Sequence, residues 1–222
     1  MKMKKNLITI AIDSPAAAGA GTQSKLLSKE YNLLYLDTGK IYRYIGKLKL
    51  DNKKQFNYSL IKKKMKNVKI KHLKGRSLLS DEIAKAASEI AKDKVIRDIV
   101  RNFQHHYAYN PPKRFKGSVL DGRDITSVIM KDAMFKFFIT ASLKVRAKRR
   151  YLEFKKLKKN IPYSHVLKSL RNRDNLDKLR KISPLKKTKD SILINTTKLS
   201  KNSCFKKIKR IIDKKLKING NI

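Results

Sequence analysis

The stretch that decides the fold is LITIAIDSPAAAGAGTQSK, residues Leu7–Lys25. Its first part, LITIAID, is a short apolar and β-rich run that ends in Asp13. The run breaks at Ser14 and Pro15 into a series of small residues, and residues favourable to a helix follow from Gly21. A strand, a loop of small residues and a helix start form the layout of a phosphate-binding loop, whose backbone N–H groups hold an anion.

The loop departs from the usual pattern G-x-x-x-x-G-K-[ST] at two positions. Ser14 stands where the pattern has its first glycine, and Ala20 stands where it has lysine. Gly19 and Gly21 can still supply unusual backbone angles, and the Thr22 hydroxyl can bind Mg²⁺ or a phosphate. On this stretch alone, a plain turn of small residues between a strand and a helix explains the pattern equally well.

The composition describes one globular chain. The 222 residues can bury one sizeable core, with room for a small inserted domain. The hydrophobic share is 41%, and no apolar run approaches the roughly 20 residues that span a membrane. We therefore expect no membrane partner. A single cysteine, Cys204, excludes an internal disulfide framework and predicts a reducing, cytoplasmic location.

The net charge of +40 comes from 57 Lys and Arg against 17 Asp and Glu, and it has two explanations. It can reflect a polyanion partner such as RNA or DNA, or a compositional drift toward lysine over the whole solvated surface. Lysines occur in nearly every segment rather than in one tail or stripe. We therefore favour the drift and expect no specific nucleic acid partner, although a positive field would attract nucleotides.

Apolar runs and helical segments alternate along the chain. The predicted strands lie at 7–13, 33–39, 117–121, 135–140 and 191–194. The predicted helices lie at 23–30, 40–50, 81–107 with a break near Lys92, 142–158, 163–173 and 205–216. Within the lysine-rich stretch 51–76, VKIKHL at 68–73 alternates and could form one strand of a small sheet. The order predicts a three-layer α/β fold, a parallel sheet with helices on both faces.

Ligands of such sheets bind at the carboxyl ends of the strands, so the polar residues there are the candidates for chemistry. VLDGRD at 119–124 ends a buried strand in Asp121, which can present a carboxylate to Mg²⁺. Arg123 can form a bidentate pair with a phosphate, and Asp124 can accept a hydrogen bond from an amino group. The plain alternative is a capping Asp with a surface ion pair.

Two further segments carry candidate groups. LDTGKIYR at 36–43 puts Thr38 at a helix start, where its hydroxyl can simply cap, and Arg43 about one turn further. Spacings of four and three put Arg173, Asp177 and Arg180 on one helical face. These three form either a ladder of salt bridges or a clamp, with arginines on phosphates and the aspartate on a ribose hydroxyl. The four histidines are scattered and do not make a metal site.

Six ordered segments together resemble bacterial cytidylate kinases over nearly the whole chain. They are the loop at 10–22, YLDTGKIYR at 35–43, EIAKAASEIAKDKVIRDIVRNFQ at 82–104, LDGRDIT at 120–126, KFFITASLKVRAKRR at 136–150 and RNRDNLDKLRKISPLKKTKDSILINTT at 171–197. The resemblance implies a nucleoside monophosphate kinase fold of the phosphate-loop type. It also implies transfer of the γ-phosphate of ATP to CMP or dCMP. A single domain would fill 1–222, with its core at 1–46 and 80–222, a CMP-binding insert at about 47–79 and a lid at about 144–173.

The resemblance implies roles for the residues that match the family's motifs. The loop backbone would hold the ATP phosphates, through Ser14, Pro15, Ala16, Ala17, Ala18, Gly19, Ala20, Gly21 and Thr22. The groups that act on the transferred phosphate would be Arg123, Asp121, Arg173 and Arg180, and Mg²⁺ would be placed by Thr22 and Asp121. CMP would be bound by Thr38, Arg43, Ser88, Arg97, Arg123, Asp124, Arg173 and Asp177. The basic helix leading into the lid carries Arg146, Arg149 and Arg150.

The family has lysine where this chain has Ala20, so one cation on the β- and γ-phosphates is missing. Losing one such charge-stabilising donor costs on the order of 100- to 1,000-fold in rate. Lys25 and Lys40 are the candidates to replace it. The alternatives are a weak or inactive nucleotide-binding homologue, an RNA-binding protein on the same fold, and a kinase for another nucleoside monophosphate. We favour an active, monomeric kinase, because the substrate-recognition residues, Ser88 and Asp177 among them, all remain.

Overall fold

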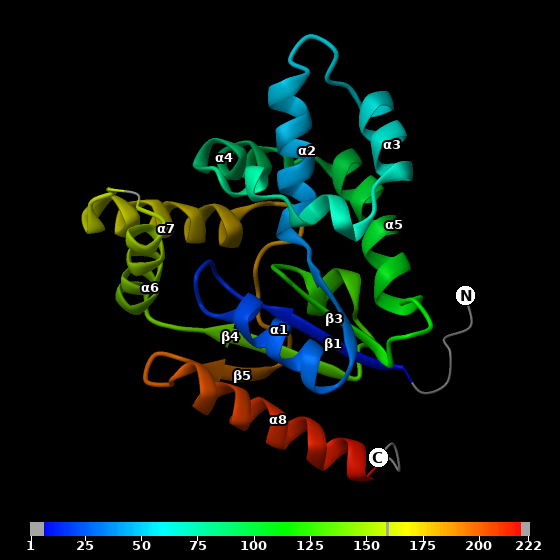
Figure 1. Cartoon of the computed structure of the whole chain (residues 1–222), viewed down its shortest axis with the longest axis vertical. Coiled ribbons are helices and arrows are strands. Elements are labelled where there is room, and N and C mark those ends of the chain that lie inside the picture. Colours follow the sequence, from blue (N-terminus) through cyan, green and yellow to red (C-terminus); the bar gives the residue numbers. More distant parts are fainter. Residues whose placement is uncertain (1–6, 159, 219–222) are drawn as a thin grey trace.

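A parallel sheet of five strands lies at the centre of this computed structural model, which describes residues 7–158 and 160–218 (Figure 1). The strand order is β2-β3-β1-β4-β5, and each neighbouring pair is parallel. The strands are β1 Ile8–Asp13, β2 Leu33–Asp37, β3 Gly117–Gly122, β4 Phe135–Thr140 and β5 Ile192–Asn195. The predicted parallel sheet is confirmed, with small shifts at the strand ends.

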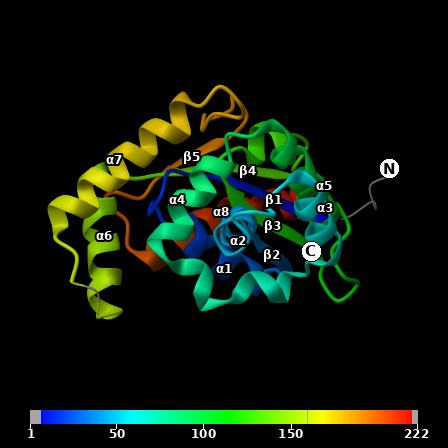
Figure 2. The same cartoon turned by 90° about the horizontal axis from the view of Figure 1, so that it is seen from above.

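Helices cover both faces of the sheet, as the alternating pattern predicted (Figure 2). On one face, helices α1 and α8 bury a core that includes Ile10, Phe137 and Ile208. On the other face, α2 and α5 bury a core that includes Leu120 and Val100. β1 is buried along its whole length because both of its faces are covered, and this explains its nearly continuous apolar run.

Apart from α3, which lies in a stretch where no helix is predicted, the helices follow the predicted order. They are α1 Ala20–Glu30, α2 Gly39–Asp51, α3 Tyr58–Asn67, α4 Asp81–Ile90, α5 Lys94–Tyr109, α6 Leu143–Lys156, α7 Tyr163–Leu179 and α8 Lys201–Ile218. The predicted break within 81–107 is confirmed, because the Asp93 side chain accepts a hydrogen bond from the Ile96 N–H and starts α5. Among residues 7–158 and 160–218, no helix is long and apolar enough to cross a membrane.

The strand predicted at 68–73 is wrong. This segment forms a short 3-10 helix, η1 Ile70–Lys74, which is followed by η2 Arg76–Leu79. Val68 and Leu73 are buried in the same core as Ile61 of α3, so the alternation reflects two buried anchors in a helical insert rather than a pleated strand. Every strand pairing in the described part of the chain belongs to the one five-stranded sheet, which leaves this segment no partner.

Helices α6 and α7 pack against each other at the side of the sheet (Figure 1). Their shared apolar contacts form a small core of their own, made by Ala147, Phe154, Val166 and Leu170. α7 continues to Leu179, well beyond the predicted end at residue 173. Ala16 and Ala17 of the loop after β1 pack against this core, and polar contacts between the pair and the rest of the molecule are described with the site below.

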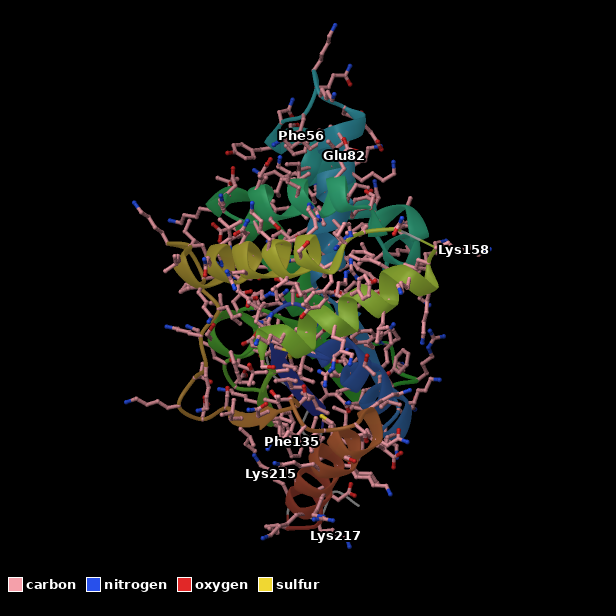
Figure 3. All side chains as sticks on the ribbon, turned by 90° about the vertical axis from the view of Figure 1, so that its left-hand side faces the viewer. Phe56, Glu82, Phe135, Lys158, Lys215 and Lys217 are labelled. Carbon is pink, nitrogen blue, oxygen red and sulfur yellow. The ribbon has the colours of Figure 1, made fainter. Side chains whose placement is uncertain are left out.

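The positive charge is spread over the molecule (Figure 3). Nitrogen-tipped side chains project from the ribbon on all sides of this view, and the labelled Lys158 and Lys217 lie at well-separated places. This distribution agrees with the lysine-rich drift expected from the sequence.

Asp13, at the end of β1, holds the segment that follows β3. Its carboxylate accepts hydrogen bonds from the Ile125 N–H at 2.7 Å and from the N–H and hydroxyl of Thr126 at 2.9 and 2.6 Å. The side chain is fully buried, and burial raises its pKa to about 6 although the hydrogen bonds act against the rise. These bonds fix the start of the π-helical segment η3 Ile125–Ile129, directly after Asp124.

Replacing Asp13 with Ala should lower the free energy of unfolding by about 3 kcal/mol, because buried donors lose their acceptor. Urea denaturation followed by circular dichroism measures the change. Asp51→Ala is the matched control, since it removes only an exposed i,i+4 pair with Lys47 and should cost less than about 1 kcal/mol. Equal losses in the two variants would contradict the anchoring role of Asp13.

Candidate functional site

The loop between β1 and α1 turns at the carboxyl end of the sheet. Gly19 has φ 101° and Ala17 has φ 60°, so the loop contains two left-handed residues, one of which is not glycine. The prediction of an unusual backbone angle is confirmed for Gly19 and wrong for Gly21, which lies in the first turn of α1. Gly21 lies in a confined place instead: a Cβ there would make a tight contact of 3.3 Å with Tyr35 Oη and an ordinary contact of 3.4 Å with Asp121 Oδ2.

Ala20, at the usual lysine position, carries no charge and is almost completely buried. It begins α1, is 4% exposed and belongs to the apolar core between the sheet and α8. Because Ala20 has no polar group, the exposed polar side chain in the first turn of α1 is that of Thr22.

Two arginines of α6 hold the backbone of the loop. Arg146 donates to the Ala16 carbonyl at 3.1 Å, and its guanidinium forms a buried two-pronged pair with Asp174 of α7. Arg149 donates to the Thr196 hydroxyl at 2.9 Å and to its carbonyl at 2.7 Å. The sequence places both arginines on the helix that leads into the predicted lid. It does not predict Asp174 and Thr196 as their partners, because no local spacing relates these residues to the arginines.

The Thr196 hydroxyl completes this support, because it donates to the Ala18 carbonyl at 3.0 Å. The loop carbonyls of Ala16 and Ala18 thus accept hydrogen bonds from Arg146 of α6 and from Thr196, which follows β5. With the carbonyls held in this way, the loop keeps one backbone conformation.

Asp177 on α7 is shared by three arginines. Arg123 Nε lies 2.6 Å from Asp177 Oδ2, Arg173 Nε lies 4.0 Å from the same oxygen, and Arg180 Nη1 lies 3.9 Å from Oδ1. Burial opposes ionisation of Asp177, but Arg123 and Arg173 outweigh it and lower the pKa of the carboxyl. The predicted grouping of Arg173, Asp177 and Arg180 is confirmed, while the closest partner, Arg123, comes from another part of the chain.

Four arginines from different elements make up what we call the arginine cluster, Arg43, Arg123, Arg150 and Arg173, in which the charges of the other three act on Arg173. Burial and the charge of Arg123 lower the pKa of Arg173 to about 10, Asp177 opposes this, and Arg43 and Arg150 add to it. The Arg173 Nε atom is buried without a hydrogen-bond partner among the described residues. Like charges held this close are suited to a multiply charged anion.

A buried ion pair lies beside this cluster. Arg97 of α5 and Asp124 are 4% and 5% exposed, and Arg97 Nη2 lies 2.5 Å from Asp124 Oδ2. The guanidinium also stacks 5.6 Å from the ring centre of Tyr42, and Arg180 Nη2 lies 3.9 Å from Asp124 Oδ1. Arg180 therefore connects this pair to Asp177.

Thr38, Arg43 and Ser88 occupy different surroundings. The Thr38 hydroxyl donates to the Asp121 carbonyl at 2.7 Å and makes no helix cap, so the capping explanation for this residue is wrong. Arg43 donates to the Leu78 carbonyl at 2.8 Å, which ties α2 to the insert. Ser88 donates to the Ala84 carbonyl within α4, and its hydroxyl makes no hydrogen bond to the other site residues among the described parts of the chain.

Asp121 is the acidic group nearest the first turn of α1. Burial raises the pKa of its carboxyl to about 8, and the charge of Asp37 adds to the rise, while Tyr35, Arg123 and Lys25 oppose it. Its Oδ1 atom is buried and accepts no hydrogen bond from the described residues. The Asp121 carboxyl, with its Oδ1 unpaired, lies beside Gly21, and a cation bound there would favour its charged form over its neutral form.

The donor set limits how Mg²⁺ could be held. In residues 7–158 and 160–218, no group of three or more His, Cys, Asp or Glu side chains could hold a metal ion. Asp121 and the exposed Thr22 flank the first turn of α1 and provide oxygen ligands. These residues are compatible with Mg²⁺, which is often bound by one or two protein groups together with phosphate oxygens and water.

A loop of small residues between the first strand of a parallel sheet and a helix is the layout of a nucleotide kinase of the phosphate-loop class. The chain belongs to the cytidylate kinase family, because the family model described as cytidylate kinase matches residues 10–214. Its similarity to individual proteins agrees with this assignment.

The chain is similar to curated proteins named cytidylate kinase. That of Fusobacterium nucleatum is 37% identical over 218 residues, which cover 93% of this chain and 98% of the relative. That of Clostridium botulinum strain Okra has the same identity and coverage. That of Paramagnetospirillum magneticum is 38% identical over 197 residues, which cover 88% of this chain and 93% of the relative.

Two solved structures share the fold. An uncharacterized protein from Eubacterium ventriosum has a TM-score of 0.55 and 18% identity, with 93% of this chain and 98% of that one covered. TT1252 from Thermus thermophilus has a TM-score of 0.51 and 14% identity, with 95% and 98% covered. At these identities the likeness concerns the fold alone.

Asp121→Asn should change how stability depends on pH in the metal-free and nucleotide-free protein. Because the folded-state pKa of Asp121 is raised, its contribution is fully present below its unfolded-state pKa of about 4 and is lost as the pH rises through about 8. The wild type should therefore lose stability relative to Asp121→Asn over this range. Thermal denaturation at a series of pH values measures the difference, and a difference that stays constant would contradict the raised pKa.

Proposed function

We propose that this chain is a cytidylate kinase that transfers the γ-phosphate of ATP to CMP or dCMP, giving ADP and CDP or dCDP. The observation that carries the proposal is the arginine cluster, with the buried pair of Arg97 and Asp124 beside it. Positive charge next to groups that can read a nucleobase suits an anion with a base attached, which describes a nucleoside monophosphate.

ATP would lie on the loop at the start of α1. The loop backbone from Ser14 to Thr22 would hold its phosphates, and the helix N-terminus would add its favourable dipole. Mg²⁺ would neutralise charge on the phosphates, with Thr22 and Asp121 as the protein groups that place it. The left-handed Gly19 and the unpartnered Asp121 Oδ1 support this arrangement.

CMP would be recognised at its base, sugar and phosphate by separate groups. Asp124 would accept a hydrogen bond from the cytosine amino group, Arg97 would donate to the base, and Ser88 would contribute its hydroxyl. Asp177 would accept from the ribose 2′-hydroxyl. The complete set that we propose for CMP consists of Thr38, Arg43, Ser88, Arg97, Arg123, Asp124, Arg173 and Asp177.

The chemistry would be a direct in-line transfer. Because the acceptor phosphate is already anionic, the reaction needs positioning and charge neutralisation rather than a strong general base. Arg123 and Arg173, with Arg180 beside them, would stabilise the charge on the transferred group. We propose that the insert at about 47–79 closes over CMP and the lid at about 144–173 closes over ATP, so that water is excluded.

A second candidate function, nucleotide binding with weak or absent turnover, is favoured by Ala20. This residue is buried and apolar, so the usual cation at its position is missing. Both candidates share the same nucleotide site, and they differ only in the rate of transfer.

The direct test is ADP release with ATP, Mg²⁺ and each of CMP, dCMP, UMP and AMP. We expect ADP production that depends on CMP or dCMP and stops when Mg²⁺ is chelated. Calorimetric binding of CMP without ADP release would assign the chain to the inactive class. Nanomolar RNA binding near physiological salt, without nucleotide turnover, would favour an RNA-binding protein instead.

Asp124→Asn should raise KM for CMP by about 10- to 100-fold, since the amide cannot replace a charged acceptor and the Arg97 charge loses its partner. KM for ATP should change little, because Asp124 belongs to the acceptor side of the proposed site. Steady-state kinetics with each substrate varied in turn measures both constants, and circular dichroism checks that the variant folds. An unchanged preference for CMP over UMP would exclude base reading by Asp124.

A further inference from the structure

We infer that Lys25 supplies the cation that the loop lacks, by reaching back along α1 to the β- and γ-phosphates of a nucleoside triphosphate. This inference rests on the proposed function of the loop as the ATP site. It names a binding residue for the donor that does not follow from the usual loop pattern, in which the lysine precedes the hydroxyl residue.

The geometry of α1 directs Lys25 toward the loop. Lys25 lies four residues after Gly21 and three after Thr22, and side chains at these spacings share one face of a helix. Each Cα–Cβ bond in a helix tilts toward the N-terminus, so the Lys25 side chain covers the turn that begins the helix. The rise along the axis from Gly21 is only about 6 Å, which a flexible four-carbon stem can span.

The charge of Lys25 acts on Asp121, which lies beside the first turn of α1. Burial and Asp37 raise the pKa of Asp121, and the positive charges of Arg123 and Lys25 act against this rise. The Asp121 carboxylate lies beside Gly21, at the first turn of α1. The Lys25 charge therefore acts in the region where the phosphates of a bound nucleotide would lie.

Other cations near the loop are already paired, whereas Lys25 is not. Arg146 binds the Ala16 carbonyl and Asp174. Arg149 binds the Ala18 carbonyl and Thr196, and Arg123 binds Asp177. Lys25 is exposed, and its ammonium group makes no hydrogen bond or salt bridge with the described residues.

Lys40, the second candidate from the sequence, is the second residue of α2 and lies beyond Thr38. Within the described parts of the chain it makes no hydrogen bond or ion pair that ties it to the loop. Lys25 lies four residues after Gly21 on the same helix, and the Cβ position of Gly21 is 3.4 Å from Asp121 Oδ2. Lys40 lies on α2 instead, and this difference favours Lys25 over Lys40.

The experiment compares Lys25→Ala, Lys25→Arg and Lys29→Ala with the wild type. Lys29 is the matched control, because it is an exposed lysine on the last turn of the same helix. Calorimetry with ATP and Mg²⁺, with ADP and Mg²⁺, and with CMP measures binding without requiring turnover. Steady-state kinetics with CMP then measures kcat and the KM for ATP.

We expect Lys25→Ala to weaken ATP and ADP binding and to lower kcat by about 10- to 100-fold, less than the loss of a buried donor because the ammonium is exposed. CMP binding should not change, Lys25→Arg should keep most of the wild-type affinity, and Lys29→Ala should resemble the wild type. Wild-type ATP affinity in Lys25→Ala, or an equal loss in Lys29→Ala, overturns the inference.

The outcomes also separate this inference from the proposed function. A selective loss of ATP binding in Lys25→Ala, in a protein without CMP-dependent ADP release, supports the inference and contradicts the kinase activity. Normal CMP-dependent turnover in both Lys25→Ala and the wild type contradicts the inference and leaves the kinase activity intact. A wild type that binds no ATP overturns both.

Discussion

Three aspartates position the arginines of the site, and the rest of the site depends on them; Asp124 and Asp174 are buried, and Asp177 is partly buried. In a chain with 57 Lys and Arg and only 17 Asp and Glu, Asp174 pairs with Arg146, Asp177 with Arg123, and Asp124 with Arg97. An unpaired charge is costly to bury, so each aspartate allows one guanidinium to be held in a low-exposure position. The first pair supports the loop, and the other two fix the side of the site that faces α7.

After this pairing, the arginine cluster still carries more positive than negative charge. Burial and the charges of Arg123, Arg43 and Arg150 lower the pKa of Arg173 to about 10, while Asp177 opposes them. Repulsion of this kind is relieved when an anion arrives, which turns part of the cost of assembling the cluster into affinity for phosphate. The general positive field of the surface attracts such ligands, but the local cluster provides the geometry.

The sequence predicted the order of strands and helices well, because parallel strands buried on both faces appear as short apolar runs. It failed at VKIKHL, where two buried side chains in a 3-10 segment imitate the alternation of a strand. It grouped Arg173, Asp177 and Arg180 correctly from their local spacing, although α7 ends at Leu179 and Arg180 follows it with an extended backbone. Thr38 differed: its hydroxyl bonds to the end of β3 rather than to its own helix.

By itself, the sequence determined the layered α/β architecture, the position of the loop at the end of the first strand, and the absence of a lysine at residue 20. Only the tertiary structure decided which arginine meets which aspartate. Arg97 and Asp124, Arg146 and Asp174, and Arg123 and Asp177 are 27, 28 and 54 residues apart in the chain. Local periodicity carries no information over such separations, because these contacts form only when the packing of helices on the sheet brings the segments together.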